Sequence, residues 1–231
     1  MRNVECGMWN YLFDKYDIFP IKSYSYFSFP IPNSQLKMYT FDYPLFLALN
    51  FDGGAFTDSV MTAVSGTVMW IPLYAAIFGY VWYKRGWKVC LAFMLCLLVT
   101  MGLADMLCGI FKHSGLLKNL WASFPPRPRP MFEPALQGAV HVPSYAHGPY
   151  GTVSSHAATV AALAVMSAAE IRRAWYTAAI ITVTLLVCYS RIYLACHYPT
   201  DLALGAAVGL FAGGAMFALY KKTAATIEKY S

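Results

Sequence analysis

The clearest chemical pattern in the sequence is Ser190-Arg191-Ile-Tyr-Leu-Ala-Cys-His197-Tyr-Pro-Thr-Asp201. Pro199 is well suited to the first position of a helix, which places His197 at the helix entrance and Asp201 about one turn inside. At that spacing a carboxylate can reach a ring nitrogen of the histidine, fix its tautomer and prepare it for nucleophilic chemistry. The alternative interpretation is a helix-capping network in which the same side chains only stabilise the helix start.

A second pattern, Ser154-Ser155-His156, directly precedes an apolar stretch. Serine is a favourable N-cap, and the free N–H groups at a helix N-terminus form an anion site. At such a site His156 could donate a proton to a leaving group. The alternative is a capped helix with an incidental histidine.

Basic residues supply a third pattern. Lys118 precedes Arg127-Pro-Arg129-Pro, and the prolines of FPPRPRP are expected to hold both arginines in an extended segment. A charge within an apolar span costs at least about 2.5–3.5 kcal/mol, so Arg191 is expected to have a function as well. Lys118, Arg129 and Arg191 would surround a phosphate dianion with three cations. Lys112 and Arg127 are the alternatives for the first two positions, and an ordinary solvated loop is the alternative for the segment.

The composition indicates the setting of these patterns. Only 12% of the 231 residues are charged and 58% are hydrophobic, whereas soluble domains have about 25% and about 45–50%. So few charges cannot cover a soluble globule, which excludes an ordinary cytosolic protein and a disordered one. The net charge of +6 is not gathered into a Lys/Arg-rich block, so no nucleic-acid partner is expected. The expected partner is the lipid bilayer.

Five apolar stretches are candidates to cross a bilayer core, which needs about 20 helical residues. They run from Met61 to Tyr83, Val89 to Phe111, His156 to Ala169, Trp175 to Cys196 and Pro199 to Tyr220. The shorter stretch Asp42–Phe51 predicts an interfacial helix. We expect an all-α, polytopic membrane helical bundle with about five spanning helices and an N-terminal interfacial helix. Residues 1–40 would be an N-terminal segment of unassigned structure, 41–222 the membrane-embedded domain and 223–231 a cytoplasmic tail.

Basic residues in the connections predict the orientation. Three sets fall on one side of the five spans, and this side is expected to be cytoplasmic: Lys84, Arg85 and Lys88; Arg172 and Arg173; Lys221 and Lys222. The opposite side receives residues 112–155 and the turn near His197. The three chemical patterns are therefore expected to converge on the outer face and to bring His156 and His197 together.

Together the patterns resemble those of the type-2 phosphatidic acid phosphatase superfamily, which includes vanadium haloperoxidases. The family patterns are Lys-x6-Arg-Pro, Pro-Ser-Gly-His and Ser-Arg-x5-His-x3-Asp. The third is complete in Ser190, Arg191, His197 and Asp201. The second has Val153 in place of Pro and Ser155 in place of Gly, and in the first, ten residues separate Lys118 from Arg129. The resemblance covers roughly residues 102–210.

The resemblance implies a metal-independent membrane lipid phosphatase without a cofactor. In that family the residue matching His197 attacks phosphorus to form a phosphohistidine, the one matching Asp201 orients it, and the one matching His156 protonates the leaving alkoxide. Phosphate binding would fall to Lys118, Arg129, Ser154, Ser155 and Arg191. The implied substrates are membrane lipid phosphates, with undecaprenyl diphosphate and lipid A first, hydrolysed at the outer face of a bacterial cytoplasmic (inner) membrane.

Three rival functions use parts of the same sequence. A lipid phosphotransferase would need the same residues, with a lipid in place of water as acceptor. A metal-dependent hydrolase could draw on Glu133, His141 and His147, although no ligand pair at helical spacing such as His-Glu-x-x-His occurs. A transporter could use Asp105 and Arg191 as an ion path, but five spans without an evident inverted repeat suit that class poorly.

Overall fold

The computed structural model describes residues 42–144 and 148–230, and the regular structure in these ranges is helical. The helices are α3 (Tyr43–Leu49), α4 (Gly54–Ser65), α5 (Ile71–Arg85), α6 (Trp87–Phe111), α7 (Ser155–Ile171), α8 (Ala174–Tyr193) and α9 (Pro199–Lys229), with 3-10 helices η1 (Val68–Trp70), η2 (Pro130–Phe132) and η3 (Pro134–Leu136). The chain divides into two units, Met1–Met38 and Tyr39–Ser231, and the described residues belong to the second. The expected all-α bundle is confirmed, whereas the predicted segment 1–40 lies outside the described residues.

Helices α6, α8 and α9 are long and apolar enough to cross a membrane, with 25, 20 and 31 residues. Helices α4 and α5 meet the same test only together, because with 12 and 15 residues each is too short alone. The two are bent by 68° at the break between them. The predicted first span, Met61 to Tyr83, is therefore divided. Gly66 ends α4 as its C-cap, and Pro72 lies in the first turn of α5, where proline starts a helix but cannot continue one.

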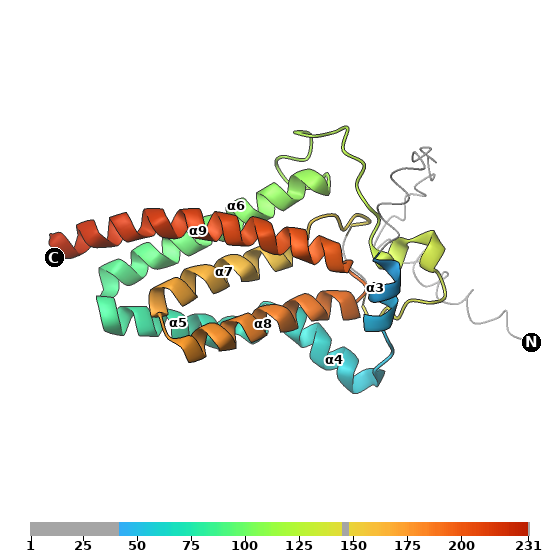
Figure 1. The fold of residues 1–231 in the computed structure, drawn as a ribbon, viewed down its shortest axis with the longest axis horizontal. Helices are drawn as coiled ribbons and strands as arrows, with labels where there is room; N and C mark the ends of the chain where they lie inside the picture. The colour runs from blue at the N-terminus through green and yellow to red at the C-terminus, as the bar shows by residue number, and fades with distance from the viewer. Residues whose placement is uncertain (1–41, 145–147, 231) are drawn as a thin grey trace, which may run out of the picture. The chain divides into compact units, whose positions relative to one another are not determined.

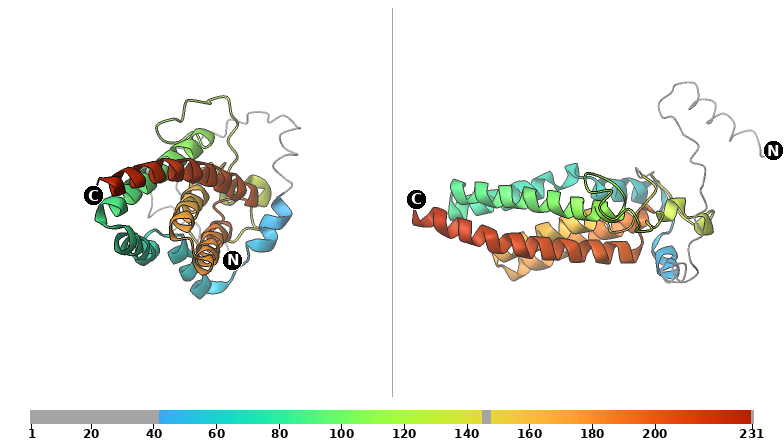
Figure 2. Two further views of the ribbon diagram at one scale, coloured as in Figure 1. Left: turned by 60° about the vertical axis from the view of Figure 1, so that its left-hand side comes forward. Right: turned by 90° about the horizontal axis from the view of Figure 1, so that it is seen from above.

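Helix α7 is apolar but, with 17 residues, is shorter than the candidate spans α6, α8 and α9. It lies between its neighbours and contacts α5, α6, α8 and α9 (Figure 2). Helix α9 packs against α7 at two glycines that leave no room for a side chain. A Cβ at Gly205 would lie 2.3 Å from the Ser154 carbonyl oxygen, and a Cβ at Gly209 would lie 2.0 Å from the Ala158 carbonyl oxygen. Because glycine lets two helix backbones approach closely, the starts of α7 and α9 lie side by side, and the Ser154 N–H donates to the Asp201 carbonyl oxygen at 2.9 Å.

The three basic connections lie at one end of the bundle, as their positions in the sequence predict (Figure 1). Arg85 at the end of α5 forms ion pairs with Glu170 near the end of α7, at 3.0 Å, and with Glu228 near the end of α9, at 2.6 Å. The opposite end of the bundle holds α3, the segment after α6, and the turn between α8 and α9 (Figure 1). The starts of α7 and α9, with Ser154, His156 and His197, belong to this second end.

Helix α3 forms where an interfacial helix was predicted, over Tyr43–Leu49. It caps the second end of the bundle: Phe46 is buried, and its ring centroid lies 5.3 Å from that of Tyr198 at the N-cap of α9. Its place at a membrane surface stays a prediction. Helix α9 continues to Lys229, so most of the predicted tail 223–231 is a helical extension of the last span.

Candidate active site

The proline-rich segment lies against the residues that precede α7. Pro128 and Tyr150 form an isolated antiparallel bridge, in which the Arg129 N–H donates to the Pro149 carbonyl at 2.8 Å and the Gly151 N–H donates to the Arg127 carbonyl at 3.0 Å. Arg129 has the extended backbone that its neighbouring prolines favour. This bridge brings both arginines to the starts of α7 and α9.

Arg127 is a structural residue in this arrangement. Its guanidinium forms a buried ion pair with Asp42, with Nη2 and Oδ1 2.5 Å apart, and lies 3.3 Å from the centroid of the Tyr198 ring. The Thr200 hydroxyl also donates to the Asp42 carboxylate, at 2.5 Å. A buried pair of this kind is stable only with such added hydrogen bonds. The pair ties α3 to the start of α9, and the Asp42 carboxylate offsets the positive charge of Arg127.

Arg129 instead faces the candidate nucleophile. Its Nη1 lies 3.3 Å from Nε2 of His197 and donates to the Cys196 carbonyl at 3.0 Å, while its Nε donates to the Gly148 carbonyl at 2.9 Å. Both carbonyls are neutral acceptors that fix the direction of the guanidinium. Of the two arginines that the sequence left as alternatives, the structure places Arg129 next to His197.

His197 is buried, and its two ring nitrogens have different surroundings. Nδ1 lies 2.8 Å from the Gly151 carbonyl oxygen and 3.9 Å from Oδ2 of Asp201. Since a carbonyl can only accept, Nδ1 carries the proton and Nε2 keeps its lone pair on the side of Arg129. The hydrogen bond that sets the tautomer goes to Gly151, whereas Asp201 accepts the backbone N–H of Tyr198 at 3.0 Å and lies further from the ring than its spacing led us to expect.

Burial, together with the positive charges of Arg129, Arg191 and Lys112, holds the pKa of His197 well below its ordinary value of 6.5. We expect this imidazole to stay neutral at pH values at which an ordinary histidine is already protonated. The unfolded chain would take up a proton near its ordinary pKa, so the free energy of unfolding should fall as the pH drops below that value. Nitrogen NMR of histidine-labelled protein in detergent, with His197→Gln for assignment, measures the titration, and a normal titration would contradict this expectation.

The start of α7 has the predicted capping geometry. The Ser154 hydroxyl is buried and accepts the Ala157 N–H at 3.4 Å. Val153 has a left-handed backbone, with φ of 58°, which is strained for a β-branched residue and which proline cannot adopt. His156 is the second residue of α7 and is exposed. It lies close enough to His197 to contribute to the lowering of the His197 pKa.

Lys112, rather than Lys118, lies next to the histidines. Its Nζ donates to the Ser155 hydroxyl at 2.5 Å, and burial lowers the pKa of its ammonium. Lys112 also acts electrostatically on His197, whereas Lys118 is an exposed residue in the segment after α6. Ser155, which stands where the family pattern has glycine, thus supplies the side chain that holds this lysine.

Arg191 completes the set of cations. It lies in the last turn of α8 and donates from Nη1 to the Ser65 hydroxyl. Its positive charge helps to lower the pKa of His197. Among the described residues the structure therefore brings His156, His197, Lys112, Arg129 and Arg191 together, with the Ser154 and Ser155 helix start between them. Sequence reasoning missed the Gly151 carbonyl and Ser65, because neither belongs to a pattern of chemically distinctive residues.

Potential metal ligands also come together away from these patterns. Within residues 42–144 and 148–230, one group of three places its ligand atoms within 4.8 Å of one another: Asp52, Asp58 and His141. Asp58 accepts from the Tyr193 hydroxyl at 2.6 Å and contacts Nε2 of His141 at 2.8 Å. Of the other ligands that a metal enzyme could use, Glu133 accepts the Ala135 N–H, and His147 lies outside the described residues.

Comparison with known proteins identifies the family. The model of the PAP2 superfamily matches residues 93–224, which is more than half of the chain. The chain belongs to the PAP2 superfamily. This is the family that the three sequence patterns resemble, and the matched range includes every residue of the set around His197.

Two relatives of this chain carry the name lipid A 4'-phosphatase. The one from Bacteroides thetaiotaomicron is 30% identical over 188 residues, which is 81% of this chain and 80% of the relative. The one from Porphyromonas gingivalis is 31% identical over 176 residues, 76% of this chain and 71% of the relative. The chain is therefore a membrane lipid phosphatase of the PAP2 type and a multi-pass protein of a family found in bacterial membranes.

A solved structure shares the fold. The crystal structure of a transmembrane PAP2-type phosphatidylglycerolphosphate phosphatase from Bacillus subtilis aligns with a TM-score of 0.57 at 19% identity, covering 86% of this chain and 90% of the other. This likeness is one of helical architecture.

Proposed function

We propose that this PAP2 protein removes a phosphate from lipid A through a phosphohistidine on His197. One observation carries the proposal: His197 is buried, its Nδ1 lies 2.8 Å from the Gly151 carbonyl oxygen, and its Nε2 lies beside Arg129. The carbonyl can only accept, so the proton belongs on Nδ1. A neutral imidazole with a fixed tautomer and an available nitrogen is the form that a nucleophile needs. The neighbouring cations would stabilise charge on the transferring phosphoryl group.

The reaction has two steps. Nε2 of His197 attacks phosphorus, a P–N bond forms, the P–O bond to the lipid breaks, and His156 gives its proton to the leaving alkoxide. His156 then accepts a proton from water as that water attacks phosphorus, which breaks the P–N bond and releases inorganic phosphate. Lys112, Arg129 and Arg191, with the N–H groups at the start of α7, are proposed to hold the phosphoryl oxygens.

The names of the two relatives support lipid A as the first substrate to test. Undecaprenyl diphosphate is the second, because it also presents phosphate groups at the membrane surface on a hydrocarbon anchor. We place the reaction at the outer face of the cytoplasmic membrane. The basic connections at the opposite end of the bundle, around Arg85, Arg172 and Lys221, support this orientation.

Phosphate release from a panel of lipid phosphates tests the function. The purified protein in detergent is expected to release phosphate from lipid A faster than from undecaprenyl diphosphate, phosphatidylglycerol phosphate or phosphatidic acid, and to do so with EDTA present. Loss of all activity in EDTA would contradict a metal-independent reaction. It would instead favour a metal site formed by Asp52, Asp58 and His141. Labelled phosphate that passes to a second lipid instead of water would indicate the phosphotransferase alternative.

A further inference from the structure

Arg191 is held by a neutral partner. Its Nη1 donates to the Ser65 hydroxyl, and its Nε is buried without a hydrogen-bond partner among the described residues. Within that part of the chain no carboxylate pairs with it, in contrast to Arg127, which pairs with Asp42. A hydroxyl fixes the direction of a guanidinium but leaves its full charge for an incoming anion. Ser65 therefore restrains Arg191 without neutralising it.

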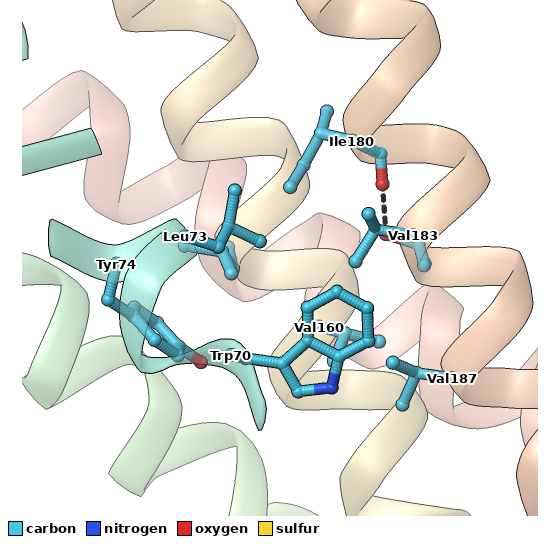
Figure 3. Close-up of a pocket in the computed structure, with 9 residues that line it drawn as sticks. Trp70, Leu73, Tyr74, Val160, Ile180, Val183 and Val187 are labelled. Atoms are coloured by element: carbon cyan, nitrogen blue, oxygen red, sulfur yellow. Dashed lines mark hydrogen bonds between the residues drawn. The ribbon is translucent and has the colours of Figure 1, made fainter. Parts of the chain in front are cut away.

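Ser65 is the last residue of α4, at the break where α4 and α5 bend by 68°. Trp70 secures this break. Its indole Nε1 donates to the carbonyl oxygen of Val64, the residue before Ser65, at 2.8 Å. Figure 3 shows the indole ring in a small apolar crevice with Val160 and Val187.

The crevice adjoins the active site along two helices. Val160 follows His156 by one turn of α7, and Val187 precedes Arg191 by one turn of α8. Thr184, which also lines the crevice, has its hydroxyl bonded to the Ile180 carbonyl at 2.8 Å, so the lining is effectively apolar. Trp70 packs against these residues and so holds the bend between α4 and α5 against α7 and α8, the helices that bear His156 and Arg191.

We propose that Ser65 is a positioning residue for Arg191, and that the bent segment from Val64 to Trp70 holds it there. This inference rests on the proposed function, in which Arg191 binds a phosphoryl oxygen. An arginine side chain has many rotamers in the absence of a partner, so a single fixed hydrogen bond aims the remaining N–H groups at the phosphate before it arrives.

The variant Ser65→Ala tests the proposal. Loss of one hydrogen bond to a charged group corresponds to roughly tenfold in an equilibrium or rate constant. We expect kcat/KM for lipid phosphate and the affinity for orthovanadate, a phosphate analogue, each to fall by about this factor. Ser65→Thr keeps the hydroxyl and should restore both. Ser59→Ala is the matched control, because Ser59 lies in the same helix and, among the described residues, its hydroxyl bonds to the Ala55 carbonyl of its own helix.

A double-mutant cycle separates positioning from a general structural role. If Ser65 acts through Arg191, Ser65→Ala should change activity by less than about twofold in an Arg191→Lys background. Wild-type activity in Ser65→Ala, or the same tenfold loss in both backgrounds, would overturn the proposal. If the wild-type protein released no phosphate from any lipid, the proposed function would fail, while the orthovanadate affinities of the same variants would still decide the role of Ser65.

Discussion

Replacing His197 by alanine is expected to lower kcat for lipid phosphate by at least about a hundredfold, because no P–N bond can form. The geometry argues for this residue over His156: its ring is buried, its Nδ1 is bound to the Gly151 carbonyl, and its Nε2 faces Arg129. Brief incubation with labelled substrate should leave acid-labile phosphate on the wild-type protein and none on the variant. Retained activity in His197→Ala would reject the phosphohistidine.

The variant His156→Ala is the informative comparison, because His156 is proposed to be the general acid and His197 the nucleophile. A leaving group of low pKa needs no proton, so an aryl phosphate should restore much of the phosphorylation rate in His156→Ala. The same substrate should not rescue His197→Ala. Equal behaviour of the two variants with both substrates would contradict the division into nucleophile and acid.

Replacing Lys112 by methionine is expected to reduce kcat/KM by roughly a hundredfold, the usual cost of removing one charged group that stabilises a transition state. Lys112 is held by the Ser155 hydroxyl at the start of α7 and acts on the pKa of His197. Methionine keeps most of the length and apolar volume of the side chain, so the loss would report on the charge. Phosphate release at several substrate concentrations gives the value.

Lys118→Met is the matched control, because that side chain is exposed in the segment after α6. Its activity should stay within about twofold of wild type, as for most surface substitutions. A large loss in Lys118→Met together with a small one in Lys112→Met would reverse the assignment of the lysine.

Local spacing was sufficient to predict several parts of this protein. The low charge content and the long apolar stretches predict a helical membrane bundle. Pro199 predicts the start of α9, and Ser154 predicts the N-cap of α7. These features depend on residues a few positions apart, whose relation is set by helix geometry and by the preferences of proline and serine. For the same reason the side chains of His197 and Asp201 could be assigned to one helix entrance.

The choice among distant residues depended on the tertiary structure. Lys112 and Lys118 are equivalent by type, and so are Arg127 and Arg129. The sequence from Lys112 to Ser154 has no hydrophobic period from which the direction of a side chain could be derived. Packing decides: Asp42 pairs with Arg127, and the bridge between Pro128 and Tyr150 brings Arg129 to His197. The acceptor for the His197 ring is a backbone carbonyl, a group that every residue carries and that only the folded chain can aim.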